Sequence, residues 1–187
     1  MATRKPLTHS PPSPETLSHF SGFPWTAPFF SDPSLTPVTN ESRAIYLNNS
    51  RDSLLSLTLA TPTTIPCWQN FHQAPTAQYP EGQVIALVKL DSGVNGHTDT
   101  AHGGFLGVLL DEVIGMACED ERKMMTAYLN VGFKKPVATP SVVLCRGWVT
   151  KREGRKIWAK GTIEDGKGVV MADGEALFVS VEREGKL

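Results

Sequence analysis

The sequence has few cysteines and no long apolar run, and each shortage removes a class of protein. Its three cysteines, Cys67, Cys118 and Cys145, are far apart and odd in number. This spacing argues against a disulfide framework and a paired-cysteine metal site, and it suits a reducing compartment. No stretch is apolar enough to cross a bilayer. The histidines show no metal-ligand spacing, so we expect no metal and no cofactor.

An excess of charge of either sign is also lacking. Lys and Arg number 18, and Asp and Glu 19, which leaves a formal net charge of −1. No global field therefore argues for nucleic acid or an anionic membrane as the main partner. The basic amino terminus lacks the apolar core of a secretory signal, so we expect a cytoplasmic protein, with a mitochondrial one as the second choice.

Prolines mark off the start of the chain. Residues 1–40 carry most of them, and such a density sustains neither a helix nor a central strand. We predict a partly disordered extension over 1–40, a helical lead-in over 41–75 and a single domain over 76–187. Five aromatic residues of the extension cluster too densely for a free tail, so we expect them to pack on the domain; a partner-binding segment is the alternative. They are Phe20, Phe23, Trp25, Phe29 and Phe30.

The remaining pattern predicts an α+β domain. Residues 83–90 read as a strand that is apolar on both faces, and the stretch 102–118, which begins with a His-Gly-Gly turn, as a helix apolar on nearly every side, which is typical of a buried helix. Alternation over 125–133 and the segments 142–150, 157–164 and 169–181 predict four strands, with a bulge at Gly174. Short turns between these strands favour an antiparallel sheet that wraps the one helix.

Two motifs together resemble the hotdog-fold acyl-CoA thioesterases, of the phenylacetate-degradation type and the thioesterase superfamily members. The first is His102-Gly103-Gly104 with Asp111 nine residues after the histidine, and the second is the strand with its Lys-Lys-Pro ending, 125–136. The resemblance covers residues 80–181. It implies a hotdog fold, a curved antiparallel β-sheet wrapped around one long central helix, in a homodimer or a dimer of dimers.

The same resemblance implies a function and roles for individual residues. The function is hydrolysis of an acyl-CoA or carrier-bound acyl thioester, in fatty acid or polyketide metabolism, with coenzyme A as part of the substrate and an acyl-carrier protein as a further partner. Asp111 is implied as general base or nucleophile, the Gly103 N–H as the donor to the thioester carbonyl, and Thr126 as an assisting hydroxyl. His102 is implied to be mainly positional. Some relatives use an asparagine shortly before the His-Gly-Gly, and Asn95 lies near that position in this sequence.

Helix geometry bears on how these residues cooperate. A helix start with two glycines, Gly103 and Gly104, offers unpaired N–H groups to a substrate oxygen. Nine residues of helix place Asp111 about 13 Å along the axis from His102, whereas a general base must come within about 3 Å of its proton. Gly103 and Asp111 of one chain therefore cannot serve one carbonyl, but a two-fold related copy can supply the second group. Glu112 points about 100° away, and we expect it at the dimer contact or in water.

Other polar residues are candidates for substrate binding. By strand alternation Thr126 shares a face with Tyr128 and Asn130, which makes Asn130 a candidate contact. Basic residues in two places suit the phosphates of coenzyme A, although a solvated hairpin is the alternative for the second. They are Lys134 and Lys135, and then Arg152, Arg155 and Lys156.

Two rival functions stay open on the sequence alone. One is an enoyl-thioester hydratase or dehydratase on the same fold. The other is a non-catalytic acyl-binding or interaction protein whose aromatic extension docks a partner.

Overall fold

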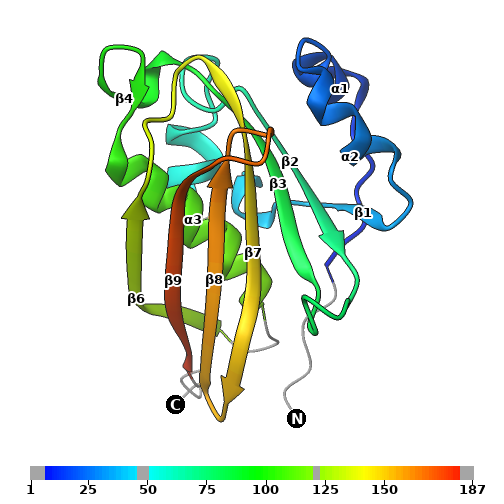
Figure 1. Ribbon diagram of the computed structural model, residues 1–187, viewed down its shortest axis with the longest axis vertical. Helices are drawn as coiled ribbons and strands as arrows, with labels where there is room; N and C mark the ends of the chain where they lie inside the picture. The colour runs from blue at the N-terminus through cyan, green and yellow to red at the C-terminus, as the bar shows by residue number, and fades with distance from the viewer. Residues whose placement is uncertain (1–6, 46–50, 120–122, 182–187) are drawn as a thin grey trace.

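A computed structural model describes residues 7–45, 51–119 and 123–181. These residues form a seven-stranded antiparallel sheet packed against one long helix, α3, Gly103–Cys118 (Figure 1). The strand order is β1-β2-β3-β7-β8-β9-β6, so β6 lies at one edge. This arrangement confirms the predicted fold class. The strands are β1 Leu35–Val38, β2 Cys67–Gln73, β3 Gln83–Leu90, β6 Lys123–Phe133, β7 Ser141–Glu153, β8 Lys156–Glu164 and β9 Val170–Val181.

Elements with strong periodicity agree with their predictions. Strand β3 begins and ends at the predicted residues, and α3 lies within the predicted stretch 102–118, with His102 as its cap. Both faces of β3 are covered, because Val84 and Ala86 face α3 while Ile85 and Leu87 face an aromatic cluster on the other side. Strand β3 is therefore a buried strand in the middle of the sheet, which accounts for its continuous apolar run.

The predicted helical lead-in is corrected over residues 67–73, which form strand β2 and pair with β3 along their whole length. Buried polar residues hide this strand in the sequence: Asn70 is 1% exposed and accepts from Trp68 Nε1 at 2.6 Å. The short helices expected between 41 and 60 appear as single turns, η2 Glu41–Arg43 and η3 Leu54–Thr58. Where the domain begins stays a prediction, and residues 1–6 and 46–50 lie outside the described residues.

A row of glycines under α3 lets the helix lie close to the sheet. Gly147, Gly161 and Gly174 are in register across β7, β8 and β9. A Cβ atom on Gly147 would lie 2.3 Å from the Val113 carbonyl oxygen, and one on Gly161 would lie 2.7 Å from the Ile114 side chain. The predicted bulge at Gly174 is wrong, since Gly174 keeps regular register with both neighbouring strands. Its missing side chain instead makes room for the helix.

The amino-terminal segment covers the outer face of the sheet beside β2. Helices α1, Pro14–Phe20, and α2, Ala27–Ser31, follow each other there, with η1, Pro24–Thr26, between them (Figure 1). The fully buried Phe71 ring of β2 lies 5.4 Å from the Phe30 ring and 6.4 Å from the Phe29 ring. The prediction that the aromatic extension packs on the domain is confirmed.

The connection from β3 to α3 is compact. Turn η4, Ser92–Val94, leads into a small hairpin of β4, Asn95–His97, and β5, Thr100–Ala101. All three cysteines are buried, and none of them forms a disulfide. Among the described helices, none has the length and apolar character needed to cross a membrane.

Candidate active site at helix α3

His102 caps the start of α3. The imidazole Nδ1 accepts a hydrogen bond from the Gly104 N–H at 2.9 Å. The backbone N–H of His102 donates to the Val94 carbonyl at 2.8 Å. The imidazole thus satisfies one of the N–H groups that a helix start leaves unpaired. Within the described part of the chain, the Gly103 N–H has no acceptor. Gly103, rather than Gly104, is therefore the amide left for a ligand oxygen.

Two other groups lie close to this helix start. Asn95 pairs with Ala101 across the β4–β5 hairpin, and its side-chain oxygen accepts from the Thr139 hydroxyl. The Phe133 ring, at the end of β6, lies where a Cβ on Gly103 would be 3.2 Å from it. The structure thus brings Asn95, His102 and Gly103 together at one end of α3.

Asp111 lies two turns further along α3 and contacts the edge strand. The Thr126 hydroxyl donates to Asp111 Oδ1 at 2.9 Å. This contact depends on a bulge in β6, where the register with β9 shifts between Thr126 and Tyr128. The bulge turns Thr126 toward the helix, so the prediction that it shares a face with Tyr128 and Asn130 is wrong. Strict alternation fails at a bulge because one residue is inserted.

Asn130 lies on the opposite face of the sheet from Asp111. It pairs with Glu175 on β9, while its neighbours Leu129 and Val131 pack against the core on the helix side. With Lys160 and Asp173 it lines an open groove of about 460 Å³ on the outer face. Within one chain, Asn130 is therefore not part of the Asp111 site.

Asp111 lines a pocket of about 440 Å³ formed between α3 and the region of turn η3. Gly104, Gly107, Val108, Asp111 and Glu112 contribute from the helix, and Asp52, Leu54 and Leu55 contribute from the region of η3. The pocket is therefore bounded on one side by residues that carry no recognisable sequence motif.

Glu112 is half-buried and other residues of the chain cover its carboxyl group, so the prediction that it lies in water is wrong, while the alternative that it lies at a dimer contact stays a prediction. Its Oε1 is buried with no hydrogen-bond partner among the described residues. Burial raises the pKa of Glu112 to about 7; a hydrogen bond from Ser42 opposes this shift, and the negative charges of Asp52, Asp111 and Glu119 add to it. Sequence reasoning missed this burial because the covering residues belong to the lead-in, whose position relative to α3 the pattern did not predict. The only signal was a second acid in an otherwise apolar helix.

None of the predicted phosphate contacts lines this pocket. Lys134 pairs with Asp173 at 3.1 Å, and Arg152 with Glu81 at 2.6 Å. The Lys135 N–H donates to the Met171 carbonyl at 3.0 Å.

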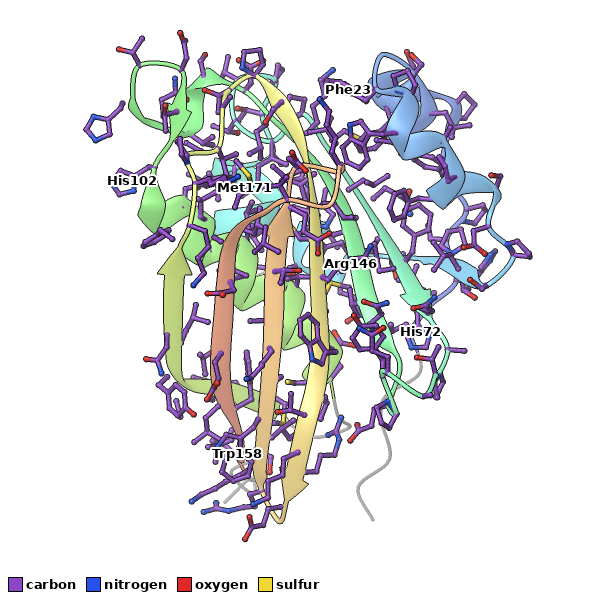
Figure 2. All side chains as sticks on the ribbon, in the orientation of Figure 1. Phe23, His72, His102, Arg146, Trp158 and Met171 are labelled. Atoms are coloured by element: carbon purple, nitrogen blue, oxygen red, sulfur yellow. The ribbon has the colours of Figure 1, made fainter. Side chains whose placement is uncertain are left out.

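Arg155 and Lys156 line a shallow hollow of about 370 Å³ with Trp158 at the β7–β8 turn. Figure 2 shows Trp158 and His102 at opposite ends of the sheet. One chain therefore does not bring this turn to its own Gly103. In the part of the chain that is described, no group of three or more His, Cys, Asp or Glu side chains could hold a metal ion.

Comparison with known proteins finds similarities to this region. Residues 98–172 match the model of the thioesterase superfamily. Acyl-coenzyme A thioesterase THEM4 of Rattus norvegicus is 30% identical over 103 residues, which are 54% of this chain and 45% of the rat protein. The Mus musculus protein of the same name is 30% identical over 105 residues, 56% of this chain and 46% of its own length. The chain thus spans less than half of these relatives.

Solved structures show the same fold. A Bacillus halodurans protein crystallised with CoA has a TM-score of 0.51 at 20% identity, covering 60% of this chain and 74% of its own. The PaaI protein from the phenylacetic acid degradation operon of Escherichia coli has a TM-score of 0.51 at 13% identity, covering 54% and 73%. The predicted resemblance and hotdog fold are confirmed, and neither rival function is favoured.

Proposed function

From the hotdog fold and the thioesterase-superfamily match, we propose that this protein hydrolyses acyl-coenzyme A thioesters. Water adds to the thioester carbonyl carbon, the carbon–sulfur bond breaks, and a free acid and the coenzyme A thiol are released. The observation that carries the proposal is the hydrogen bond of 2.9 Å from Thr126 to Asp111, an acid that lines a pocket on a helix whose Gly103 N–H is open at its start.

Asp111 is the group that acts on water or on the carbonyl carbon. The Thr126 hydroxyl donates to Oδ1 and fixes the carboxylate plane, which leaves Oδ2 to accept a proton from water or to attack directly. Positioning of this kind matters because a general base must lie within about 3 Å of the proton that it removes. Thr126 therefore assists by orientation.

The Gly103 N–H is the donor that stabilises the oxyanion. It lies in the first turn of α3, where the helix dipole adds partial positive charge. His102 occupies the neighbouring Gly104 N–H and holds the helix start in place. An oxyanion donor of this kind typically contributes about 2.7–4 kcal/mol to transition-state stabilisation.

Two protomers that pair through strand β6 in a two-fold dimer build each site from residues of both chains. Strand β6 is a sheet edge of eleven residues with exposed apolar side chains, including Met125 and Phe133, and such an edge is suited to pairing with a second strand. In one protomer Phe133 lies by Gly103, and Thr126 lies by Asp111. Antiparallel pairing about the middle of β6 therefore sets Gly103 of one protomer beside the partner's Asp111.

The same symmetry gives the basic turn a role. Arg155 and Lys156 lie at the end of the sheet away from their own His102 (Figure 2). A two-fold axis across β6 brings that end toward the partner's helix start. Arg155 and Lys156 would then contact the phosphates of coenzyme A bound there, and they would contribute to binding rather than to the chemical step.

The test uses two variants that each remove one half of the site. Asp111→Asn removes the base, and Gly103→Pro removes the amide hydrogen at the first helical position, where proline is tolerated. The preceding His102, at φ −65° and ψ 135°, already has the backbone that proline requires of its neighbour. We expect each variant to lose about 100-fold or more in kcat, measured as thiol release from a panel of acyl-CoAs.

Mixing the two inactive variants tests the shared site. Random exchange makes half of the dimers mixed, and each mixed dimer holds one intact site, so about a quarter of the wild-type activity returns. Gly103→Ala is the matched control, because it adds the same Cβ beside Phe133 but keeps the N–H. Full activity in a folded Asp111→Asn variant contradicts the assignment, and no recovery in exchanged mixtures contradicts the shared site.

A further inference from the structure

Turn η3, Leu54–Thr58, forms the wall of the Asp111 pocket opposite α3. It lies outside residues 98–172, which match the thioesterase superfamily. Leu54 is 51% exposed, and it lines the pocket with Asp111 and Val108. On the helix side a Cβ atom on Gly107 would meet nothing within 4 Å, so the space between helix and wall is open.

The wall is built rigidly into the fold. Asp52, with a left-handed φ of 55°, starts the turn, and its carbonyl accepts the N–H groups of Leu55 and Ser56 at 3.1 and 2.9 Å. Leu55 and Ser56 are 6% and 5% exposed. The Leu59 N–H donates back to the Leu54 carbonyl at 2.8 Å. A turn held in this way keeps Leu54 at a fixed place in the pocket.

Arg43 and Glu112 join the wall to the helix. The Arg43 guanidinium donates to the Leu55 carbonyl at 3.4 Å and to the Ile65 carbonyl at 3.1 Å. Glu112 on α3 accepts from Ser42 and lies close enough to Arg43 for their charges to interact. Glu112 is therefore a positioning residue for the wall, and α3 forms one unit around the pocket with turns η2 and η3.

Two of the three wall residues that line the pocket, Leu54 and Leu55, are apolar. Asp52, the other acid on that side, is paired with Arg51 at 3.0 Å. Leu54 and Val108 therefore offer an apolar path that begins at Asp111. A thioester whose carbonyl lies at Asp111 must direct its acyl chain along some path in this pocket, and an apolar chain gains by removing such surface from water.

We propose that η3 is the specificity-determining wall of the acyl site, with Leu54 in contact with the acyl chain. This inference rests on the proposed thioesterase function. It assigns to a segment outside the matched region the choice of acyl chain length and bulk.

The experiment compares two leucines of the same turn. Leu57 is 54% exposed, nearly the same as Leu54, but it does not line the pocket. We would measure by calorimetry the affinity of Leu54→Ala, Leu54→Trp, Leu57→Ala and wild-type protein for alkyl-CoA thioethers of increasing chain length. These thioethers cannot be hydrolysed, so binding is measured without turnover.

Leu54→Ala is expected to weaken binding of the thioether that the wild type binds best by about tenfold and to move the preference to bulkier chains. Leu54→Trp is expected to move the preference to shorter chains, and Leu57→Ala to leave the profile unchanged. Identical profiles for the Leu54 and Leu57 variants, or no thioether binding at all, overturn the proposal. Thiol release from the matching acyl-CoAs is measured in parallel. A shifted binding profile without hydrolysis refutes the thioesterase function and leaves the acyl wall supported.

Discussion

Replacing Glu112 by glutamine tests the electrostatics of the pocket directly. Glu112 has one buried oxygen without a partner among the described residues, and its pKa is raised from the ordinary value of 4.5 to about 7, mainly by burial. Glu112→Gln keeps the size and shape of the side chain but cannot ionise. Comparing the free energy of unfolding of this variant with that of the wild type therefore measures how much ionisation of Glu112 destabilises the folded state.

The sign follows from proton binding. Below pH 4.5 the group is protonated in both the folded and the unfolded chain. Between pH 4.5 and about 7 the folded chain keeps a proton that the unfolded chain has lost, so the free energy of unfolding falls as the pH rises through this window. The interval between the two values, at about 1.36 kcal/mol per pH unit, corresponds to about 3 kcal/mol. The glutamine variant is spared this loss, so its advantage over the wild type grows to about 3 kcal/mol above pH 7.

The assay is urea unfolding followed by circular dichroism at pH 4.5, 6 and 8, at one fixed protein concentration because assembly also affects stability. Subtracting wild type from variant removes the titration of all other groups. Glu175→Gln is the control, since Glu175 forms an exposed ion pair with Lys160 at 3.3 Å and its loss should change stability by less than about 1 kcal/mol. Equal pH profiles for Glu112→Gln and the wild type would refute the reasoning.

Two further changes test the Asp111 contact and the aromatic cover. Thr126→Val removes the hydroxyl that holds Asp111 and should lower kcat about tenfold in thiol release. Thr126→Ser keeps a hydroxyl and should retain most of the wild-type kcat. Equal activity of the valine and serine variants would show that the hydrogen bond does not assist. Phe71→Ala should lower the free energy of unfolding by about 3–5 kcal/mol in urea titration, because Phe71 is fully buried against Phe29 and Phe30. Ile45→Ala, at a side chain 61% exposed, should stay within about 0.5 kcal/mol, and a similar loss in both would contradict the packing argument.

The parts of the fold that sequence could predict are those with uniform periodicity. The apolar run 103–118 has one consistent environment and became α3, and residues 83–90 became β3. The prediction that Asp111 lies well along the helix that starts at His102 is also confirmed, because His102 caps α3 and Asp111 lies within it. Local pattern is enough where the whole segment faces a single kind of surroundings.

Prediction failed where a distant segment decides the environment. Strand β2 contains buried Gln69 and Asn70, whose polar groups are satisfied by contacts that the sequence does not reveal. Glu112 differs from Asp111 because residues near 42 and 52 cover it. The orientation of Thr126 depends on a bulge in β6, which alternation alone cannot reveal. In all three cases tertiary packing overrides the local pattern.

Three glycines of the sheet determine how close helix α3, which carries the candidate catalytic acid Asp111, lies to the strands. Gly147, Gly161 and Gly174 form a shallow channel across the sheet, and α3 settles into it at Val113 and Ile114, directly after the two acids. The depth of that channel fixes the height of the helix above β8 and β9, and with it the reach from Asp111 to Thr126 on the sheet edge. Glycines that touch no substrate thereby determine whether Asp111 and Thr126 lie within hydrogen-bond distance.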